Sequence, residues 1–255
     1  MSHAPFTLTY AGLTDVGVQR SVNQDCYSIA LDGSLFVVAD GMGGHAGGQE
    51  ASRIATDTIC DYVKAHVGAM DLACTQNTAE SIPVILEQAV LKANQAILAD
   101  QKLHPERADM GTTAVVLFVK NGEFWCVHVG DSRLYLMRES GFFQVTQDHT
   151  WVTRALSAGL ITLEQSYHHP LRHVLSQCVG REDLRSVEAQ RIDVEPNDQL
   201  LLCSDGLTEE LSKDAIITHL QQGKTCQEQV GALVEAAKTN GGRDNITAIA
   251  ISVSV

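Results

Sequence analysis

The sequence predicts an α+β fold in which two packed antiparallel sheets carry helices on their outer faces. Two long segments, beginning at Ala51 and Ser81, place apolar residues at helical spacing. Residues 112–146 contain short apolar runs separated by turn residues, which is typical of antiparallel strands. Strand-like segments occur toward both ends of the chain, and the paired helices are therefore expected to cover the sheets.

The two helical segments are defined by their apolar stripes. In the first, the stripe consists of Ile54, Ala55, Thr58, Ile59, Tyr62 and Val63. In the second, Ser81 is expected to cap the helix, and the stripe consists of Ile82, Ile85, Leu86, Ala89, Ala93 and Ile97. The segment Gly68–Thr78 between them is predicted to be a loop.

The strands that follow are predicted to form one antiparallel meander. Thr112–Lys120 and Glu123–Val129 flank Asn121-Gly122, a pair that favours a two-residue type I′ hairpin turn. Arg133–Met137 and Phe142–Thr146 follow across another turn that contains glycine.

The rest of the chain mixes helices and strands. Residues 147–180 break the strand rhythm and are predicted to leave the sheet. The remaining predicted elements are a strand at Gln199–Cys203, helices at Ser212–Leu220 and Thr225–Lys238, and a strand at Ile246–Val255. Thr225 and Glu228 have the spacing of a capping box, and Asn240-Gly241 is expected to end that helix. Because no linker or repeat divides the sequence, residues 1–255 are predicted to form a single domain.

The chain is strongly acidic, with 31 acidic and 18 basic residues and a formal charge of −13. This charge disfavours binding to nucleic acid and to anionic membranes. No signal peptide is visible, and apolar runs such as Leu35–Ala39 are too short to span a bilayer. The seven scattered cysteines argue against a disulfide framework and a zinc knuckle. A cytoplasmic location is therefore expected.

Aspartates stand where apolar runs begin or end. They are Asp40, Asp131, Asp205 and Asp244, and Asp25 ends a polar run near the N-terminus. Any one of them alone is more often a turn residue than a ligand. Together they favour a site for hard cations such as Mg²⁺ and Mn²⁺, which prefer oxygen ligands.

Several other phosphate-transfer chemistries are excluded by missing motifs. No cysteine has an arginine six positions later, and the sequence lacks D-x-D-x-[TV], the G-x-S-x-G elbow and the P-loop. A water activated by metal ions is the nucleophile that remains.

Six short motifs now carry a resemblance to a known family. They are Arg20-x-x-Asn-Gln-Asp25, Val38–His45, Gly111–Thr113, Val129–Arg133, Ser204–Leu207 and Arg243–Asn245. In this order the sequence resembles the PPM/PP2C-type metal-dependent serine/threonine protein phosphatases, from Ala11 to Val253. It looks closest to the compact bacterial members, particularly the cyanobacterial ones.

The resemblance implies a four-layer α/β/β/α sandwich with a binuclear Mn²⁺ or Mg²⁺ centre. It implies that Asp40 bridges both metals and that the Gly41 carbonyl binds one of them. Asp205 and Asp244 would complete the other site, and Asp25 would orient a metal-bound water.

Two further residues take roles from the resemblance. A third, weaker metal would bind Asp131 with help from Asp205. Arg20 matches the arginine that grips the substrate phosphate, a task that suits its guanidinium fork. Outside this motif, Arg20 would more often form a surface salt bridge.

The sequence departs from the eukaryotic relatives at two positions. Met42 stands where those relatives carry the histidine proposed to protonate the leaving group, and His45 is the nearby candidate for this role. Gln24 replaces a glutamate, so the water-mediated contact with the second metal is expected to differ.

Residues 147–180 correspond to a flap beside the cleft in the bacterial members. Their histidines, His149, His168, His169 and His173, would suggest zinc. However, Pro170 interrupts the pair His169 and His173, and no cysteine or acid completes a tetrahedral set. Substrate selection or a mobile lid is the favoured role.

Two alternatives come from other classes. Gly41–Ala46 fits a loose G-x-G-x-x-[GA] pattern after a strand, which would indicate a dinucleotide-binding oxidoreductase. A catalytically silent pseudo-phosphatase that binds phosphoproteins is the second, although no expected metal aspartate is missing. Cyanobacterial relatives suggest a PII-type signalling protein as substrate, and nothing in the sequence requires more than a monomer.

Overall fold

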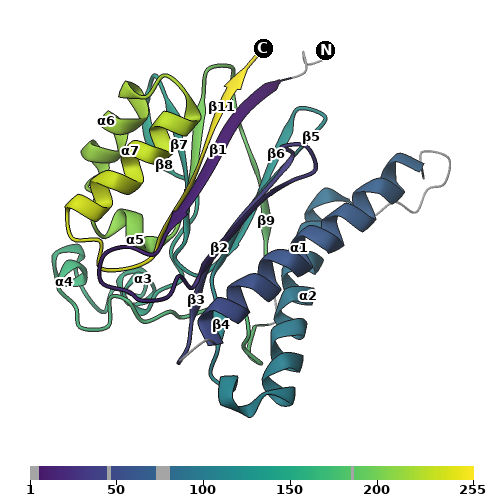
Figure 1. Ribbon diagram of the computed structural model, residues 1–255, viewed down its shortest axis with the longest axis vertical. Helices are drawn as coiled ribbons and strands as arrows, with labels where there is room; N and C mark the ends of the chain where they lie inside the picture. Colours follow the sequence, from purple (N-terminus) through teal and green to yellow (C-terminus); the bar gives the residue numbers. More distant parts are fainter. Residues whose placement is uncertain (1–5, 45–46, 73–80, 185–186) are drawn as a thin grey trace.

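The computed structural model describes residues 6–44, 47–72, 81–184 and 187–255. Two antiparallel sheets pack face to face, with helices on both outer surfaces (Figure 1). The predicted α+β sandwich is therefore confirmed.

Each sheet combines strands that lie far apart in the sequence. The first sheet contains, in spatial order, β1 (Thr7–Asp15), β11 (Ile246–Ser254), β10 (Gln199–Cys203), β7 (Arg133–Arg138) and β8 (Gly141–Gln144). The second contains β2 (Asp25–Ala30), β3 (Leu35–Met42), β5 (Ala114–Lys120), β6 (Glu123–Val129) and β9 (Ala189–Ile192). A short strand, β4 (Gly111–Thr112), pairs with the end of β3.

The helices divide between the two outer faces. α1 (Gly47–Leu72) and α2 (Ile82–Leu103) cover the second sheet, and η1 (Pro105–Arg107) follows them. α5 (Asp205–Thr208), α6 (Lys213–Gln222) and α7 (Cys226–Thr239) lie on the side of the first sheet. Two short helices, α3 (Trp151–Ser157) and α4 (Leu163–Tyr167), lie in the segment 147–180.

The alternation of side chains along the strands produces three hydrophobic layers. In β3, Leu35 and Val37 pack beneath α1 and α2, whereas Phe36 and Val38 pack between the sheets. All four side chains are fully buried, which accounts for an apolar run without polar alternation. Because both faces of β3 are covered, its end is a rigid mount for the next residues.

The strand predictions were partly correct. Asn121 and Gly122 have φ angles of 54° and 78°, which confirms the type I′ turn. The single meander is wrong, because β6 and β7 belong to different sheets. The chain changes sheets after Gly130, whose φ of 104° favours glycine.

The helix predictions need two corrections. The prediction of a loop at Gly68–Thr78 is wrong for residues 68–72, because α1 continues to Leu72. The remainder of that segment lies outside the described residues. Ser81 is the N-cap of α2 but makes no side-chain cap hydrogen bond. The capping box of Thr225 and Glu228 is confirmed.

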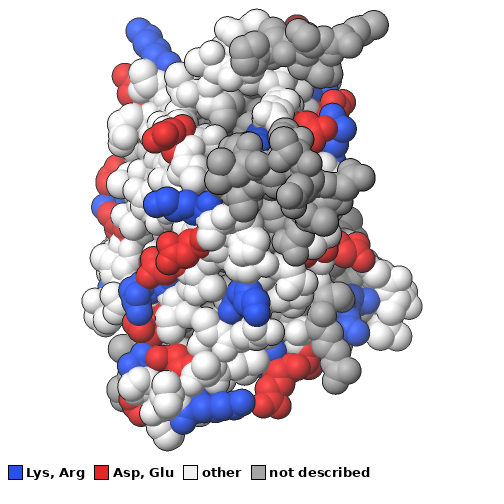
Figure 2. All heavy atoms as spheres, turned by 90° about the vertical axis from the view of Figure 1, so that its right-hand side faces the viewer, with Lys and Arg blue, Asp and Glu red and all other residues white. Residues whose placement is uncertain are grey.

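The topology also decides between the alternatives. All named strand pairs of the described chain are antiparallel, whereas a dinucleotide-binding fold needs a parallel sheet. The dinucleotide-binding alternative is therefore wrong. No helix in the described part of the chain is long and apolar enough to cross a membrane. On the face shown in Figure 2, basic and acidic side chains are interspersed among the coloured atoms.

Candidate metal centre

The first two aspartates are brought together by a strand pairing. Asp25 begins β2 and lies directly opposite Asp40 near the end of β3. The Asp40 backbone is held in turn by Thr113, whose Oγ1 accepts the Asp40 N–H at 2.9 Å. Thr113 separates β4 from β5, so the predicted continuous strand from Thr112 is broken where it supports Asp40.

Asp205 and Asp244 come from the other sheet. Asp205 begins α5 and is separated from β10 by Ser204 alone, and Asp244 precedes β11, which pairs with β10. The two loops approach closely at Gly206, where an added Cβ would lie 2.0 Å from the Asn245 carbonyl oxygen. Only glycine allows this approach without a backbone shift.

These loops converge on one cavity of about 250 Å³. The residues predicted for the site that line it are Arg20, Asp40, Gly41, Asp131, Asp205 and Asp244. The predicted convergence therefore occurs, at an edge where the ends of both sheets meet.

Asp25 lies buried at the rear of this arrangement. Its Oδ2 accepts hydrogen bonds from Ser204 Oγ at 2.7 Å and from Thr247 Oγ1 at 2.6 Å. Its Oδ1 is also buried, yet it has no hydrogen-bond partner among the described residues. Burial raises the pKa of Asp25 to about 7, and the charges of Asp205 and Asp244 add to this effect.

Burial also raises the pKa of three further carboxyl groups, those of Asp131, Asp40 and Asp205. Burial raises the pKa of Asp131 to about 8, with a further contribution from Asp205. Burial and the neighbouring aspartates raise the pKa of Asp40 well above its usual value. The pKa of Asp205 is also raised, mainly by burial, although its hydrogen bond with Asp40 opposes the increase. Without a counter-charge, these carboxylates would repel one another.

The donor set fits hard divalent cations. Four aspartates line the cavity, and one buried oxygen of the adjacent Asp25 has no hydrogen-bond partner among the described residues. A positive charge would stabilise these carboxylates. Gly41 lies at the same point, and a Cβ there would meet the Gly48 carbonyl oxygen at 1.9 Å. A larger residue would therefore displace the loop from the aspartates.

Arg20 lies at the rim of the cavity. Its Nη2 donates to Asp244 Oδ2 at 2.7 Å, and the arginine side chain is 51% exposed. Arg20 therefore forms a salt bridge, as a surface arginine would, and also lies at the predicted site. Its exposed surface leaves the guanidinium accessible to a second anion.

The predicted proton donor, His45, lies outside the residues that the structure describes. Met42 lines the cavity, as its place in the sequence suggests, but a thioether cannot donate a proton. Gln24 also lines the cavity, and its backbone carbonyl accepts the Gly41 N–H at 3.1 Å.

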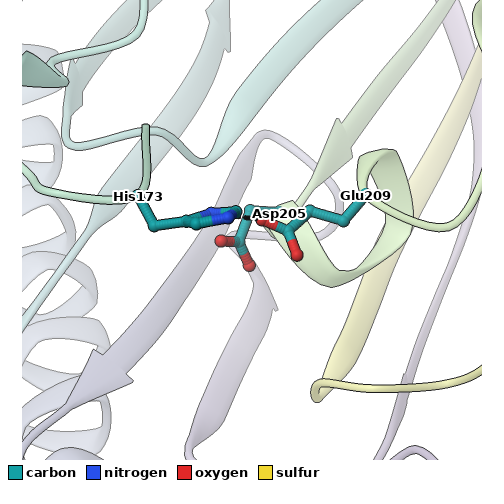
Figure 3. Close-up of side chains that lie close together, drawn as sticks. All are labelled: His173, Asp205 and Glu209. Atoms are coloured by element: carbon teal, nitrogen blue, oxygen red, sulfur yellow. Dashed lines mark ion pairs between the residues drawn. The ribbon is translucent and has the colours of Figure 1, made fainter. Parts of the chain in front are cut away.

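A cluster missed by the sequence reasoning extends the site. His173, from the segment 147–180, places its Nδ1 2.6 Å from Glu209 Oε1, an ion pair when the ring is protonated, beside Asp205 (Figure 3). One ligand atom from each of the three residues lies within 4.8 Å of the others, a spacing that can hold a metal ion. The fold supplies both acids, from α5 and its C-cap, and the three residues do not by themselves complete a tetrahedral set.

The other histidines of this segment do not join that cluster. His168 and His169 follow α4, and the ring of His169 stacks on Trp151 with centroids 4.5 Å apart. His149 is stacked on His128 instead. The described residues therefore form no site of several histidines.

A sequence model of the protein phosphatase 2C family matches residues 18–238. The chain belongs to the protein phosphatase 2C family. It is 32% identical over 253 residues to the serine/threonine protein phosphatase PstP of Mycobacterium tuberculosis, covering 99% of this chain and 46% of PstP. It is also 32% identical to the protein phosphatase PhpP of Streptococcus pneumoniae, covering 95% of this chain and 96% of PhpP.

Solved structures of the family agree with the fold. The M. tuberculosis PstP/Ppp crystal structure matches with a TM-score of 0.83 at 31% identity, over 97% of this chain and 99% of that chain. The PstP catalytic domain in complex with two manganese ions matches with a TM-score of 0.81 at 30% identity, over 98% and 100%. This protein phosphatase 2C chain thus spans about half of full-length PstP and nearly all of its catalytic domain.

Proposed function

We propose that the chain is a metal-dependent serine/threonine protein phosphatase that hydrolyses phosphoserine and phosphothreonine in phosphoproteins. The observation that carries this proposal is the gathering of four aspartates and Arg20 in one cavity. The family membership and the manganese-bound PstP catalytic domain support the same reaction.

The predicted site residues are proposed to form two metal sites, with Asp25 in a supporting role. We propose that two Mn²⁺ or Mg²⁺ ions would be held here, with Asp40 contributing to both sites, the Gly41 carbonyl to one, and Asp205 and Asp244 to the other. When bound, such ions lower the pKa of a water and neutralise charge on the phosphoryl group. Asp25 orients that water, a role that fits its partnerless buried oxygen.

Arg20 binds the substrate phosphate through two guanidinium nitrogens. Its contact with Asp244 fixes one side of the guanidinium and leaves the exposed side for the phosphate oxygens. In this proposal Arg20 holds the phosphate beside the carboxylates and is not itself a metal ligand. The proposed proton donor to the leaving oxygen is His45.

A third, weaker cation site is proposed at Asp131 and Asp205. Asp131 lies in the same cavity, and burial together with Asp205 raises its pKa. A positive ion at this point would relieve the repulsion between the two carboxylates.

Residues 147–180 are proposed to act as a flap within one domain spanning residues 1–255. Its residue His173 lines the same cavity as the aspartates, so the segment borders the substrate. A PII-type signalling protein is the proposed substrate, and a cytoplasmic monomer is the proposed state. The formal charge of −13 suits a protein partner better than nucleic acid.

Phosphate release from p-nitrophenyl phosphate and from a phosphoserine peptide tests the reaction. We expect turnover with Mn²⁺, none with EDTA, and loss of turnover in Asp40→Asn and Asp205→Asn. Asp57→Asn is the matched control, because Asp57 pairs with Arg53 on the exposed face of α1 and should leave turnover unchanged. Peptide binding without turnover under any metal condition would instead indicate a pseudo-phosphatase.

A further inference from the structure

We propose that His149 is a positioning residue that ties both ends of segment 149–176 to the turn carrying Asp131. The inference rests on the proposed function only in that Asp131 is taken as a cation ligand. His149 lies outside the cavity lined by the aspartates, so its contribution comes through the backbone of Gly130.

Two hydrogen bonds join His149 to the residue before Asp131. The His149 N–H donates to the Gly130 carbonyl at 2.9 Å. The Gly130 N–H donates in return to His149 Nδ1 at 3.2 Å. His149 therefore holds both polar groups of the Gly130 backbone. Its side chain accepts from the N–H, and its backbone N–H donates to the carbonyl.

The same histidine also holds the far end of the segment. The Ser176 N–H donates to the His149 carbonyl at 2.8 Å, and the Trp151 N–H donates to the Val174 carbonyl at 2.7 Å. These hydrogen bonds hold residues 149–151 against residues 174–176, and this paired base of the segment is bonded to Gly130 through His149. Movement of the intervening residues would be transmitted to this attachment.

The Gly130 turn is confined from the opposite side. A Cβ at Gly130 would lie 2.6 Å from Thr113 Cγ2, so the turn packs directly on Thr113. Thr113 Oγ1 accepts the Asp40 N–H and lies 2.6 Å from Ser132 Oγ. Asp131 therefore lies on a turn that is held between His149 and Thr113, the residue that also bonds to the Asp40 backbone.

The ring of His149 is suited to accept a hydrogen bond. It stacks on His128 with centroids 4.6 Å apart, and His128 Nε2 donates to the Gln147 carbonyl at 2.9 Å. Burial lowers the pKa of His149 to about 4, with a smaller effect from His128. The neutral ring leaves Nδ1 free of a proton for the Gly130 N–H.

The consequence is reciprocal. If His149 links the segment to Asp131, then occupancy at Asp131 must order the segment, and loosening the segment must weaken binding at Asp131. The order of segment 149–176 would thus depend on cation binding at Asp131 through this base, without any residue of the segment binding the cation.

Hydrogen–deuterium exchange with and without Mn²⁺ tests this link, since it needs no turnover. His149→Phe keeps a stacking ring but removes the acceptor, whereas His149→Asn retains an acceptor oxygen near the Nδ1 position. His169→Phe is the control, because His169 lies in the same segment and stacks on Trp151, whereas His149 is the histidine that accepts from Gly130.

We expect His149→Phe to speed exchange about tenfold in peptides covering 126–134 and 149–176, because a buried donor loses its partner. The same variant should need about tenfold more Mn²⁺ to protect them. His149→Asn should restore most of the protection, and His169→Phe should leave residues 126–134 unchanged.

Faster exchange spread uniformly over the chain in His149→Phe would overturn the proposal, since it would indicate only a lower global stability. Unchanged exchange at 126–134, or failure of His149→Asn to restore it, would also overturn it. Phosphate release by the wild type separates the two claims. An inactive wild type that shows the local exchange pattern contradicts the proposed function and not the link.

Discussion

Replacement of Asp25 by asparagine tests whether the gathered carboxylates destabilise the protein when no cation is bound. Asparagine keeps an oxygen that can accept from Ser204 Oγ and Thr247 Oγ1, so the two buried hydroxyls retain their acceptor. The substitution removes a buried charge with little change in volume. It therefore isolates the electrostatic cost of the site.

The magnitude follows from the pKa of Asp25, which burial raises from 3.8 to about 7. A difference of one in pKa corresponds to about 1.4 kcal/mol, so a difference of about 3 corresponds to about 4 kcal/mol. Because a raised carboxyl pKa favours the protonated folded state, this stability is present below about pH 4. It is lost as the pH rises from about 4 to about 7.

Urea unfolding in EDTA at pH 5 and pH 8 measures the effect. We expect Asp25→Asn to be more stable than the wild type at pH 8, by roughly 2–4 kcal/mol after partial relaxation of the site. At pH 5 the advantage should shrink, because Asp25 is then mostly protonated. With excess Mn²⁺ the order should reverse, since the wild type alone keeps the full set of carboxylates.

Two results would refute this reasoning. One is an Asp25→Asn protein that is less stable than the wild type in EDTA at pH 8. The other is an identical pH dependence of the unfolding free energy in both proteins between pH 5 and 8. Either result would mean that Asp25 is not an uncompensated charge in the metal-free fold.

Three further predictions concern the surroundings of the site. Arg20→Ala should raise KM about tenfold and lower kcat much less, since Arg20 binds phosphate; steady-state kinetics would contradict this if KM is unchanged. Gly206→Ala should lower the unfolding free energy by about 3 kcal/mol because its Cβ meets the Asn245 carbonyl, whereas Gly231→Ala, with no atom within 4 Å, should not destabilise the protein. The depressed pKa of His149 should cost stability as the pH falls from 6.5 to about 4, a loss that His149→Asn should lack in matched unfolding curves.

The parts of the fold that follow from local pattern were predictable. Asn121-Gly122 specifies its turn through the positive φ angles that both residues tolerate. The capping box at Thr225 depends on residues three positions apart. The sheet change at Gly130 was not predictable, because the same strand pattern suits one sheet or two, and only packing across the core decides.

The site shows the same division. Asp40 and Asp205 were identified because each ends an apolar run that a buried strand explains. Glu209 was missed because its sequence surroundings are those of an ordinary helix end, and only the fold places His173 beside it. His149 was considered as a zinc ligand, whereas its hydrogen bonds with Gly130 depend on a contact between residues 19 positions apart.

The central claim is that Asp40, Asp205 and Asp244 hold divalent cations in the cavity that Arg20 borders. The most direct measurement is an anomalous difference map from Mn²⁺-soaked crystals, collected at the manganese absorption edge. Two strong peaks are expected between these aspartates, with Asp40 contacting both. A cavity without anomalous density at saturating Mn²⁺, or peaks only elsewhere on the acidic surface, would contradict the claim.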